Sequence, residues 1–231
     1  LLAHSGVFNA GSLKYQRVIR IATHPAVQQH GVGKALLNKI IAQTECDLVG
    51  ASFASSTDII NFWAQSGFYP VRLGLHKDDV SGCHSVMMLK AASSKGQELL
   101  STTIDRFQQH WPQLLLSQFS QLDTDLVVKI SQLLPTLKAE ITLCDRQETH
   151  AFANGQRGYE FSQISLWNYL HQQIHNHHFL QLSQQQQDLC IKSILQQHAW
   201  TDIAKKSAFS GKGQTMNALR EAVRDLLVLT D

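Results

Sequence analysis

The segment from Gln28 to Lys34 carries the clearest chemical pattern in the sequence. It reads Gln-Gln-His-Gly-Val-Gly-Lys, and we expect it to join a strand to a helix. Unpaired N–H groups and the positive end of the dipole attract phosphate to a helix start. Gly31 and Gly33 would let the main chain approach a pyrophosphate, and Lys34 adds a cation. The spacing fits neither a Walker A loop nor a dinucleotide fingerprint, so another phosphate cradle and an ordinary tight turn both stay open.

Two aromatic residues, Phe62 and Trp63, are of a type that stacks on nucleic-acid bases. They stand at helical spacing shortly before Gly67, a residue that commonly ends a helix. Aromatic side chains in that setting more often fill a core than bind a base. We therefore favour a core position for both.

A group of histidines near the middle of the second half invites a metal interpretation. His171 and His175 are one helical turn apart, and His177 and His178 follow. No HExxH glutamate or partner cysteine accompanies them. We expect a solvated helix face here and no metal site.

The elements that must position the Gln28–Lys34 loop alternate between strands and helices. A Ser56 or Thr57 cap would start a helix with Ile59, Ile60 and Trp63 on one face. This alternation indicates an α/β sandwich. We expect strands over 17–23, 48–53, 68–73 and 86–89, and helices over 35–41 and from about 57 to 66.

Beyond residue 92 the pattern becomes almost purely helical, so we expect one region over 1–91 and a helical tail over 92–231. The closing helix carries an apolar stripe of Leu219, Val223, Leu226 and Leu227. We expect helices over 99–119, 126–134, 164–175, 184–197 and 216–229.

Composition narrows the class of protein. Apolar residues make up 43% and charged residues 16% of 231, which excludes global disorder. No apolar run approaches the roughly 20 residues that span a bilayer, and no secretory signal pattern is visible. The four cysteines form no CxxC pair, which fits a reducing compartment. We expect a cytoplasmic protein without a membrane partner. Because the chain opens on Leu1 and not on Met, we also expect a piece of a longer polypeptide.

Four further motifs occur in order around the Gln28–Lys34 loop: RIATHP at 20–25, NFWAQSGF at 61–68, VRLGLH at 71–76 and SGC at 81–83. Together with the QxxGxG loop, this set resembles the acetyltransferase domain of the bacterial tRNA(Met) cytidine acetyltransferase (TmcA) family, which has the phosphate loop of GNAT acetyltransferases. The resemblance covers about residues 13–90. It continues more faintly into the tail, through Ser210-Gly211-Lys212, Arg220 and Arg224.

The resemblance implies a partial GNAT acyltransferase fold, a mixed sheet with helices, followed by a mostly α-helical C-terminal region. The first strands of that fold would be missing before Arg17. It also implies acetyl transfer from acetyl-CoA to N4 of the wobble cytidine of elongator tRNA(Met). In this family ATP, with Mg, acts through a helicase-like module that carries a Walker A loop. No such loop occurs here, so ATP would be used only by the remainder of the same polypeptide.

The resemblance also assigns candidate site residues. The backbone of Ile21, Ala22 and Thr23 would face the thioester and pantetheine. The family has an acid at Asp58 and an arginine at Gln65 near the cofactor, and Gln65 departs from that arginine. The pyrophosphate would be held by Gln28, Gln29, His30, Gly31, Val32, Gly33 and Lys34. The tail would bind tRNA phosphates through Lys205, Lys206, Lys212, Arg220 and Arg224.

The catalytic base stays open. The amino lone pair of cytosine is delocalised into the ring, so proton removal can come late, as the new bond forms. His24, His76 and Asp58 are candidates by residue type, but His24 beside Pro25 fits a cap better, and His76 fits a loop. Cys83 could form an acyl-enzyme, yet a small core cysteine is more common, so we expect direct transfer.

Two other functions remain possible. One is a GNAT enzyme that acetylates a protein or a small-molecule amine, for which the helical tail and the SGC and FW motifs would be unusual. The other is a noncatalytic RNA-binding or scaffolding fragment. That alternative gains weight if missing strands leave the sheet unable to bind acetyl-CoA.

Overall fold

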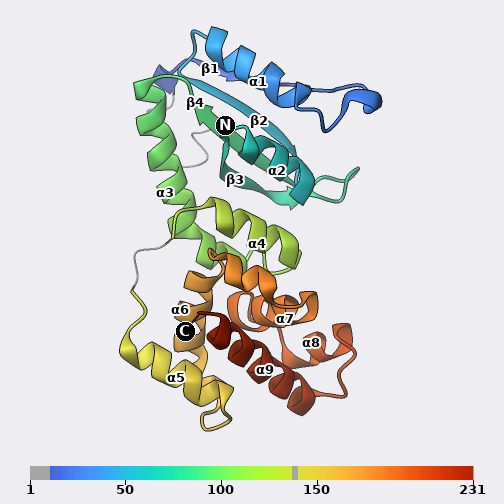
Figure 1. Cartoon of the computed structure of the whole chain (residues 1–231), viewed down its shortest axis with the longest axis vertical. Coiled ribbons are helices and arrows are strands. Elements are labelled where there is room, and N and C mark those ends of the chain that lie inside the picture. Colours follow the sequence, from blue (N-terminus) through green and yellow to red (C-terminus); the bar gives the residue numbers. More distant parts are fainter. Residues whose placement is uncertain (1–10, 137–139, 231) are drawn as a thin grey trace. The chain divides into compact units, whose positions relative to one another are not determined.

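The computed structural model describes residues 11–136 and 140–230, so parts of the expected 1–91 and 92–231 regions lie outside it. A mixed sheet with helices comes first and a helical region follows (Figure 1), which confirms the expected fold class. The chain divides into two compact units, residues 1–110 with 133–135 and residues 111–132 with 136–231. The division falls inside helix α3 (Ser94–Leu116), whereas the composition changes near residue 92.

The sheet of the first unit has the strand order β1-β2-β4-β3. β1 is parallel to β2, and the pairs β2–β4 and β4–β3 are antiparallel. The two inner strands, β2 and β4, hold apolar residues that are almost fully buried, which fits a sheet covered on both faces. The strands span Tyr15–Arg17 (β1), Leu48–Ala54 (β2), Tyr69–Lys77 (β3) and His84–Ala91 (β4).

The expectation of a strand over 17–23 was wrong in its extent. β1 ends at Arg17, and its pairing with β2 ends where the Val18 N–H donates to the Gly50 carbonyl at 2.8 Å. Residues 18–24 then run as irregular chain. Their β-branched residues favour a strand, but strand formation depends on a neighbour to pair with, and here the chain leaves the sheet.

The two expected helices beside the sheet are confirmed as α1 (Val32–Gln43) and α2 (Thr57–Gln65). Ser56 is the cap of α2, since its hydroxyl accepts the Ile59 N–H, and Gly67 follows its end at φ +83°. Ile60 and Trp63 are buried as expected, whereas Ile59 is 42% exposed. The apolar face of α2 is therefore narrower than its sequence indicated.

At the end of β1 and β2 opposite to Val18, Asp47 ties several segments together. Its carboxylate accepts the Lys14 N–H at 2.9 Å and the Ser93 hydroxyl at 2.6 Å. Its backbone carbonyl accepts the Ala92 N–H at 2.9 Å. Gly96 packs so tightly here that a Cβ on it would lie 2.0 Å from the backbone carbonyl oxygen of Asp47. We call this set, Lys14, Asp47, Ala92, Ser93 and Gly96, the Asp47 junction.

The helices beyond α3 include two that the sequence pattern did not reveal, α5 and α8. α5 begins at a capping box in which Thr142 and Asp145 bond reciprocally. The expected helix over 184–197 is α7 continued by a π-helical turn over Ile191–Leu195. The helices span Thr124–Leu133 (α4), Leu143–Ala153 (α5), Tyr159–Gln173 (α6), Gln184–Cys190 (α7), Trp200–Lys206 (α8) and Lys212–Thr230 (α9).

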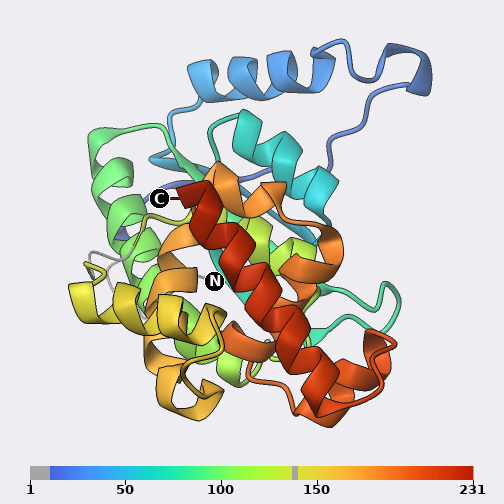
Figure 2. The same cartoon turned by 60° about the horizontal axis from the view of Figure 1, so that its bottom comes forward.

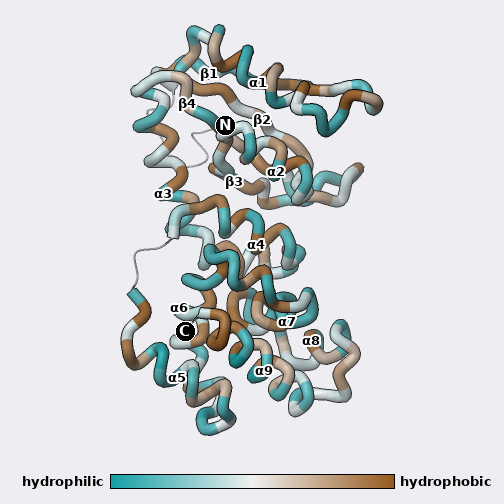
Figure 3. The backbone as a smooth tube through the Cα atoms, in the orientation of Figure 1, coloured by the Kyte–Doolittle hydropathy of each residue, from teal (hydrophilic) through white to brown (hydrophobic). Residues whose placement is uncertain are grey.

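Helix α9 is central to the second unit. It packs against α5, α7 and α8, and in Figure 2 it crosses the view in red. Its expected apolar stripe is confirmed, because Leu219, Val223, Leu226 and Leu227 are all buried. Figure 3 shows hydrophobic and hydrophilic positions interleaved along the helices of this unit. None of the helices in the described part is long and apolar enough to cross a membrane.

Candidate functional site

A cavity of about 740 Å³ opens in the first unit where residues 18–23 leave the sheet. Its walls come from that irregular segment, the turn before α1, the end of β2 and the first turns of α2. The volume falls within the range of roughly 300–1,000 Å³ that is usual for small-molecule and cofactor pockets. The lining residues are Val18, Ile19, Arg20, Ile21, Ala22, Thr23, Gln28, Gln29, Gly33, Ala51, Ser52, Phe53, Asp58, Ile59, Phe62 and Trp63.

Seven of the twelve expected cofactor residues line this cavity. They come from three separate stretches of chain: Ile21, Ala22, Thr23, Gln28, Gln29, Gly33 and Asp58. The other five do not line it. Gln65 is the last residue of α2, and the remaining four belong to the loop and the first turn of α1: His30, Gly31, Val32 and Lys34.

The start of α1 has no side-chain cap. Gly31 occupies the N-cap position at φ +79°, and no side chain accepts a hydrogen bond there. The first turn contains no acidic residue, and a Cβ on Gly31 would meet nothing within 4 Å. Because the first N–H groups of a helix have no partner within the helix, this start offers donors and positive potential to an anion.

Gly33 has a different role from the one that its spacing suggested. A Cβ at this position would lie 2.9 Å from Cε2 of Phe62 on α2. The absence of a side chain therefore lets α1 approach α2 closely. Of the two glycines, Gly31 is the one whose conformation and open surroundings suit a phosphate loop.

Aromatic rings form the apolar wall of the cavity. Phe53 and Trp63 stack with ring centroids 5.7 Å apart, and Phe62 meets Trp63 edge-on at 5.7 Å. Trp63 is buried, which confirms the expected core position, while Phe62 is half-buried and faces the cavity. Sequence reasoning missed Phe53 and Ser52. No sequence signal marked them, because they line the cavity only where the pairing of β1 with β2 has ended, at Gly50.

The charged side chains that line the cavity are Arg20 and Asp58. Asp58 lies in the first turn of α2, where the positive end of the helix dipole favours a carboxylate. His24 instead caps the 3₁₀ turn Pro25–Val27, its Nδ1 accepting the Ala26 N–H at 3.2 Å, as the capping interpretation expected. His76 was expected in a loop, which was wrong, because β3 continues to Lys77; the side chain is exposed on that strand and does not line the cavity.

Residues 38–93 match the family model described as GNAT acetyltransferase 2. The chain is 31% identical over 233 residues to tRNA(Met) cytidine acetyltransferase TmcA of Nitrosococcus halophilus, covering 99% of this chain and 31% of the relative. It is 32% identical over 226 residues to TmcA of Vibrio cholerae, covering 96% and 30%.

The resemblance to the TmcA family is confirmed. It extends over nearly the whole chain, including the helical region, and the TmcA protein of Methanopyrus kandleri shows it at 24% identity over 240 residues. The chain spans about a third of the length of the TmcA relatives it matches (31%, 30% and 27%). The mixed sheet with its helices is accordingly a GNAT acyltransferase fold.

Cys83 is the residue of the SGC motif that could have formed an acyl-enzyme. It does not line the cavity of the first unit. It precedes β4 in the β3–β4 connection, is half-buried, and its thiol donates to the Ser81 carbonyl at 3.4 Å. The expectation of a core position was therefore wrong, because the strand begins only at His84.

The histidine group of the TmcA-like tail is not a uniformly solvated face. His171 is 7% exposed and stacks on Trp167 at 4.8 Å between centroids. Burial, with a smaller contribution from His175, lowers the pKa of His171 to about 4, so it is neutral at pH 7. The expectation was wrong for His171 because α6 is covered on that side. Within the residues described, no group of three His, Cys, Asp or Glu side chains could hold a metal ion.

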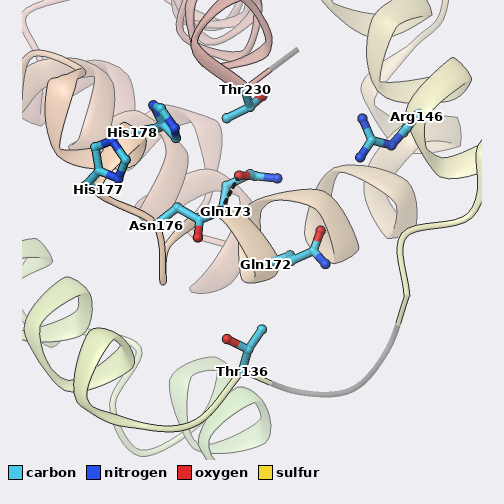
Figure 4. Close-up of a pocket in the computed structure, with 8 residues that line it drawn as sticks. All are labelled: Thr136, Arg146, Gln172, Gln173, Asn176, His177, His178 and Thr230. Atoms are coloured by element: carbon cyan, nitrogen blue, oxygen red, sulfur yellow. Dashed lines mark hydrogen bonds between the residues drawn. The ribbon is translucent and has the colours of Figure 1, made fainter.

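A second, polar cavity of about 490 Å³ lies within the helical unit (Figure 4). The side chains drawn around it come from the residues before α5, from α5 and α6, from the segment after α6, and from the end of α9. Asn176 donates to the Gln173 side chain at 2.8 Å, so part of its lining is internally bonded. It is lined by Thr136, Arg146, Gln172, Gln173, Asn176, His177, His178 and Thr230.

The five basic residues expected to bind tRNA differ in their surroundings. Lys205 and Lys206 are exposed at the end of α8. Lys212 pairs with Glu160 at 3.3 Å between Nζ and Oε1. Arg220 and Arg224 instead donate to backbone carbonyl groups, of Arg157 at 3.3 Å and of Ala153 at 2.7 Å.

Proposed function

We propose that this chain is part of an N-acetyltransferase that transfers acetyl from acetyl-CoA to N4 of the wobble cytidine in elongator tRNA(Met). The observation that carries the proposal is the cavity at the open end of β1 and β2, next to the uncapped start of α1. Two kinds of similarity support it: the match of residues 38–93 to a GNAT family model, and relatives named as tRNA(Met) cytidine acetyltransferases.

The residues present suit acetyl-CoA. The first-turn N–H groups of α1 and the turn from Gln28 would hold the pyrophosphate, with Lys34 adding positive charge. Residues 21–23 and the Phe62 ring would flank the pantetheine arm along the cavity. When bound, acetyl-CoA supplies an activated acetyl group, and the backbone N–H groups of residues that have left the sheet can polarise its carbonyl.

Asp58 is the group that fits proton transfer best, because it is the carboxylate among the residues that line the cavity. When the bond from cytidine N4 to the acetyl carbon forms, the carbon–sulfur bond would break with its electron pair leaving on the sulfur of coenzyme A, and one proton on N4 must leave. The Asp58 carboxylate would accept it directly or through one water. His24 and His76 are less suited, since one caps a turn and the other is exposed on β3.

The tRNA would be held by the helical tail, residues 92–231, where Lys205, Lys206 and Lys212 add to the electrostatic attraction. ATP, with Mg, would act through a helicase-like module of the longer polypeptide, in keeping with relatives about three times as long as this chain. The reaction would take place in the cytoplasm.

Calorimetric titration of the chain with acetyl-CoA tests the proposal, comparing it with Gly31→Glu. The substitution brings a negative side chain to the place of the pyrophosphate, and we expect binding to be lost. Gly82→Glu is the matched control: Gly82 also has positive φ (+64°) and open space around it, but it lies at the β3–β4 connection away from the cavity. Equal loss in both variants, or no binding by the unmodified chain, would overturn the assignment of this cavity.

A second assay identifies whether the chain acetylates RNA or another amine. The chain, acetyl-CoA and a tRNA(Met) transcript are incubated, and the digested RNA is analysed by mass spectrometry for N4-acetylcytidine. Acetyl-CoA binding together with acetylation of an amine substrate but not of the RNA would favour the alternative GNAT function. Binding of RNA without binding of acetyl-CoA would favour the noncatalytic alternative.

A further inference from the structure

The main chain of β2 points its hydrogen-bonding groups alternately toward β4 and toward β1. Just beyond the end of β2, the Ser55 N–H donates to the His84 carbonyl at 2.8 Å. Hydrogen-bonded and non-hydrogen-bonded pairs alternate along the antiparallel register of β2 and β4, so Ser52, three residues earlier, belongs to a non-bonded pair. Its N–H and its carbonyl therefore both point away from β4, toward the side of the sheet where β1 lies.

At the level of Ser52, β1 has already left the sheet. The β1–β2 ladder ends with the bond from the Val18 N–H to the Gly50 carbonyl, at 2.8 Å. A longer parallel ladder would continue with bonds from the Ser52 N–H to the Val18 carbonyl and from the Arg20 N–H to the Ser52 carbonyl. Neither bond is formed in the described part of the chain, because residues 18–24 run as irregular chain. Ser52 thus keeps one main-chain donor and one main-chain acceptor without a partner among the described residues.

These two groups belong to the wall of the cavity of about 740 Å³. Ser52 is half-buried and lines it, as does Asp58 from the first turn of α2. A main-chain donor and acceptor with little access to water are costly when nothing satisfies them. A ligand that presents the opposite pattern of one acceptor beside one donor therefore gains binding energy at this place.

We propose that the main chain of Ser52 selects the target base by pairing with its Watson–Crick edge. Cytosine offers N3 as an acceptor directly beside the N4 donor, which matches the adjacent N–H and carbonyl of one extended residue. Uracil and guanine present the reverse order, an N–H beside a carbonyl oxygen, and would oppose both groups of Ser52. Adenine shares the pattern of cytosine, so this contact separates amino bases from uracil and guanine.

The same contact would orient the amino group for reaction. One N4 proton bonds to the Ser52 carbonyl, and the second stays available to the Asp58 carboxylate, which lines the same cavity. Ser52 is in this role a positioning and specificity residue that acts through its main chain. The inference rests on the proposed function, because it takes cytidine as the target, and it adds the group that recognises the base.

The test uses three labelled trinucleotides that differ only in the first base: cytidine, 3-deazacytidine or uridine, each followed by adenosine and uridine. 3-Deazacytidine keeps the amino group and lacks the N3 acceptor, and the identical phosphates cancel the electrostatic attraction from the comparison. By fluorescence anisotropy, the unmodified chain should bind the cytidine form about tenfold more tightly than either of the others, the effect of one or two hydrogen bonds.

Ser52→Pro removes the N–H without breaking a bond to β4, since that N–H points away from β4. It should abolish the difference between cytidine and 3-deazacytidine. Ser52→Ala keeps both main-chain groups and should retain the difference. Ala54→Pro is the matched control, because Ala54 has the same orientation two residues later, is exposed and does not line the cavity.

Nuclear magnetic resonance gives a second measurement that needs no proline variant. The amide proton resonance of Ser52 should move downfield with the cytidine trinucleotide and stay in place with the 3-deazacytidine form. The inference is overturned if the unmodified chain binds the three trinucleotides equally or not at all, if Ser52→Ala loses the discrimination, or if folded Ser52→Pro keeps it.

Titration of the same samples with acetyl-CoA distinguishes this inference from the proposed function. Acetyl-CoA binding without discrimination among the bases would overturn the role of Ser52 and leave the cofactor site standing. Discrimination among the bases without acetyl-CoA binding would do the reverse. If Ser52→Pro loses acetyl-CoA binding and keeps the base preference, the two main-chain groups serve the cofactor, and the inference is wrong.

Discussion

The two ends of the β1–β2 pair are built in opposite ways. At one end the Asp47 junction joins β1, β2, the end of β4 and the start of α3 through short hydrogen bonds. At the other end the pairing stops at Val18, and the chain diverges to line the cavity. Hydrogen bonds therefore fix the chain at the closed end, whereas at the open end residues 18–23 are left to line the cavity.

Glycines show the same contrast. Gly96 in the Asp47 junction has no room for a Cβ, whereas Gly31 at the open end has nothing within 4 Å. One is required by packing and the other by its backbone conformation. A glycine-rich pattern alone does not reveal which of these applies, and only the second leaves space for a ligand.

The largest expected effect is at the closed end. Gly96→Ala places a methyl group 2.0 Å from the Asp47 carbonyl oxygen, so the start of α3 or the end of β4 must shift. We expect the free energy of unfolding to fall by about 3 kcal/mol, as for severe overpacking. Urea unfolding followed by circular dichroism measures it.

Gly213→Ala is the matched control for that experiment. Gly213 is also near the start of a helix, α9, and has open space around it. Alanine there should stabilise the chain slightly, by about 0.5 kcal/mol or more. If both substitutions change the free energy of unfolding equally, tight packing at the Asp47 junction does not stabilise the fold.

Ser93→Ala should have the next largest effect. The Ser93 hydroxyl donates to the Asp47 carboxylate and accepts the Gly96 N–H at 3.1 Å, so it caps α3 and ties it to the sheet. Loss of such a cap costs about 1–2 kcal/mol. Ser93→Thr, which keeps the hydroxyl, should recover most of the stability, and a failure to do so would contradict the capping role.

Gly31→Ala should cost about 1 kcal/mol of stability, since an alanine at φ +79° is strained although it meets no neighbour. Its effect on acetyl-CoA binding should be smaller than that of Gly31→Glu, because it adds no charge. Chemical unfolding and calorimetry on the same samples measure both. If Gly31→Ala lowers the free energy of unfolding as much as Gly96→Ala does, the two glycines do not differ in packing as described.

The smallest effect is a dependence on pH at the closed end. Hydrogen bonds from the Ser93 hydroxyl and the Lys14 N–H lower the pKa of Asp47. Because the pKa is lower in the folded chain, the carboxylate stabilises the fold above its unfolded pKa of about 3.9, and this contribution disappears as the pH falls through the folded pKa. The stability difference between the unmodified chain and Asp47→Asn should therefore shrink between pH 5 and pH 2, and a constant difference would contradict it.

Local signals in the sequence predicted much of the fold. The Ser56 cap, the helix end at Gly67 and the Leu219–Leu227 stripe depend on neighbours in sequence, and all were confirmed. The extent of β1 could not be predicted in this way, because it depends on where β2 stops pairing with it. α8 was missed because two turns are too short for a clear periodicity.

The candidate site was predictable to a similar degree. The family resemblance pointed to the Gln28–Lys34 loop and Asp58, and part of that set lies around one cavity. Ser52 and Phe53 could not be found from the sequence, since they face the cavity only because β1 leaves β2 beside them. The burial of His171 likewise results from packing between distant segments, which its helical spacing did not show.

The short β1 strand has one further consequence. Its last bond, from the Val18 N–H to the Gly50 carbonyl, lies at the edge of the cavity, so Val18 belongs to both the sheet and the binding site. Local opening of this strand edge and occupation of the cavity are therefore linked equilibria, and a ligand that binds only the closed form must lower the population of the open form. Amide hydrogen exchange at Val18 would then report occupancy directly, with protection that rises with ligand concentration while exchange at Lys14 stays constant.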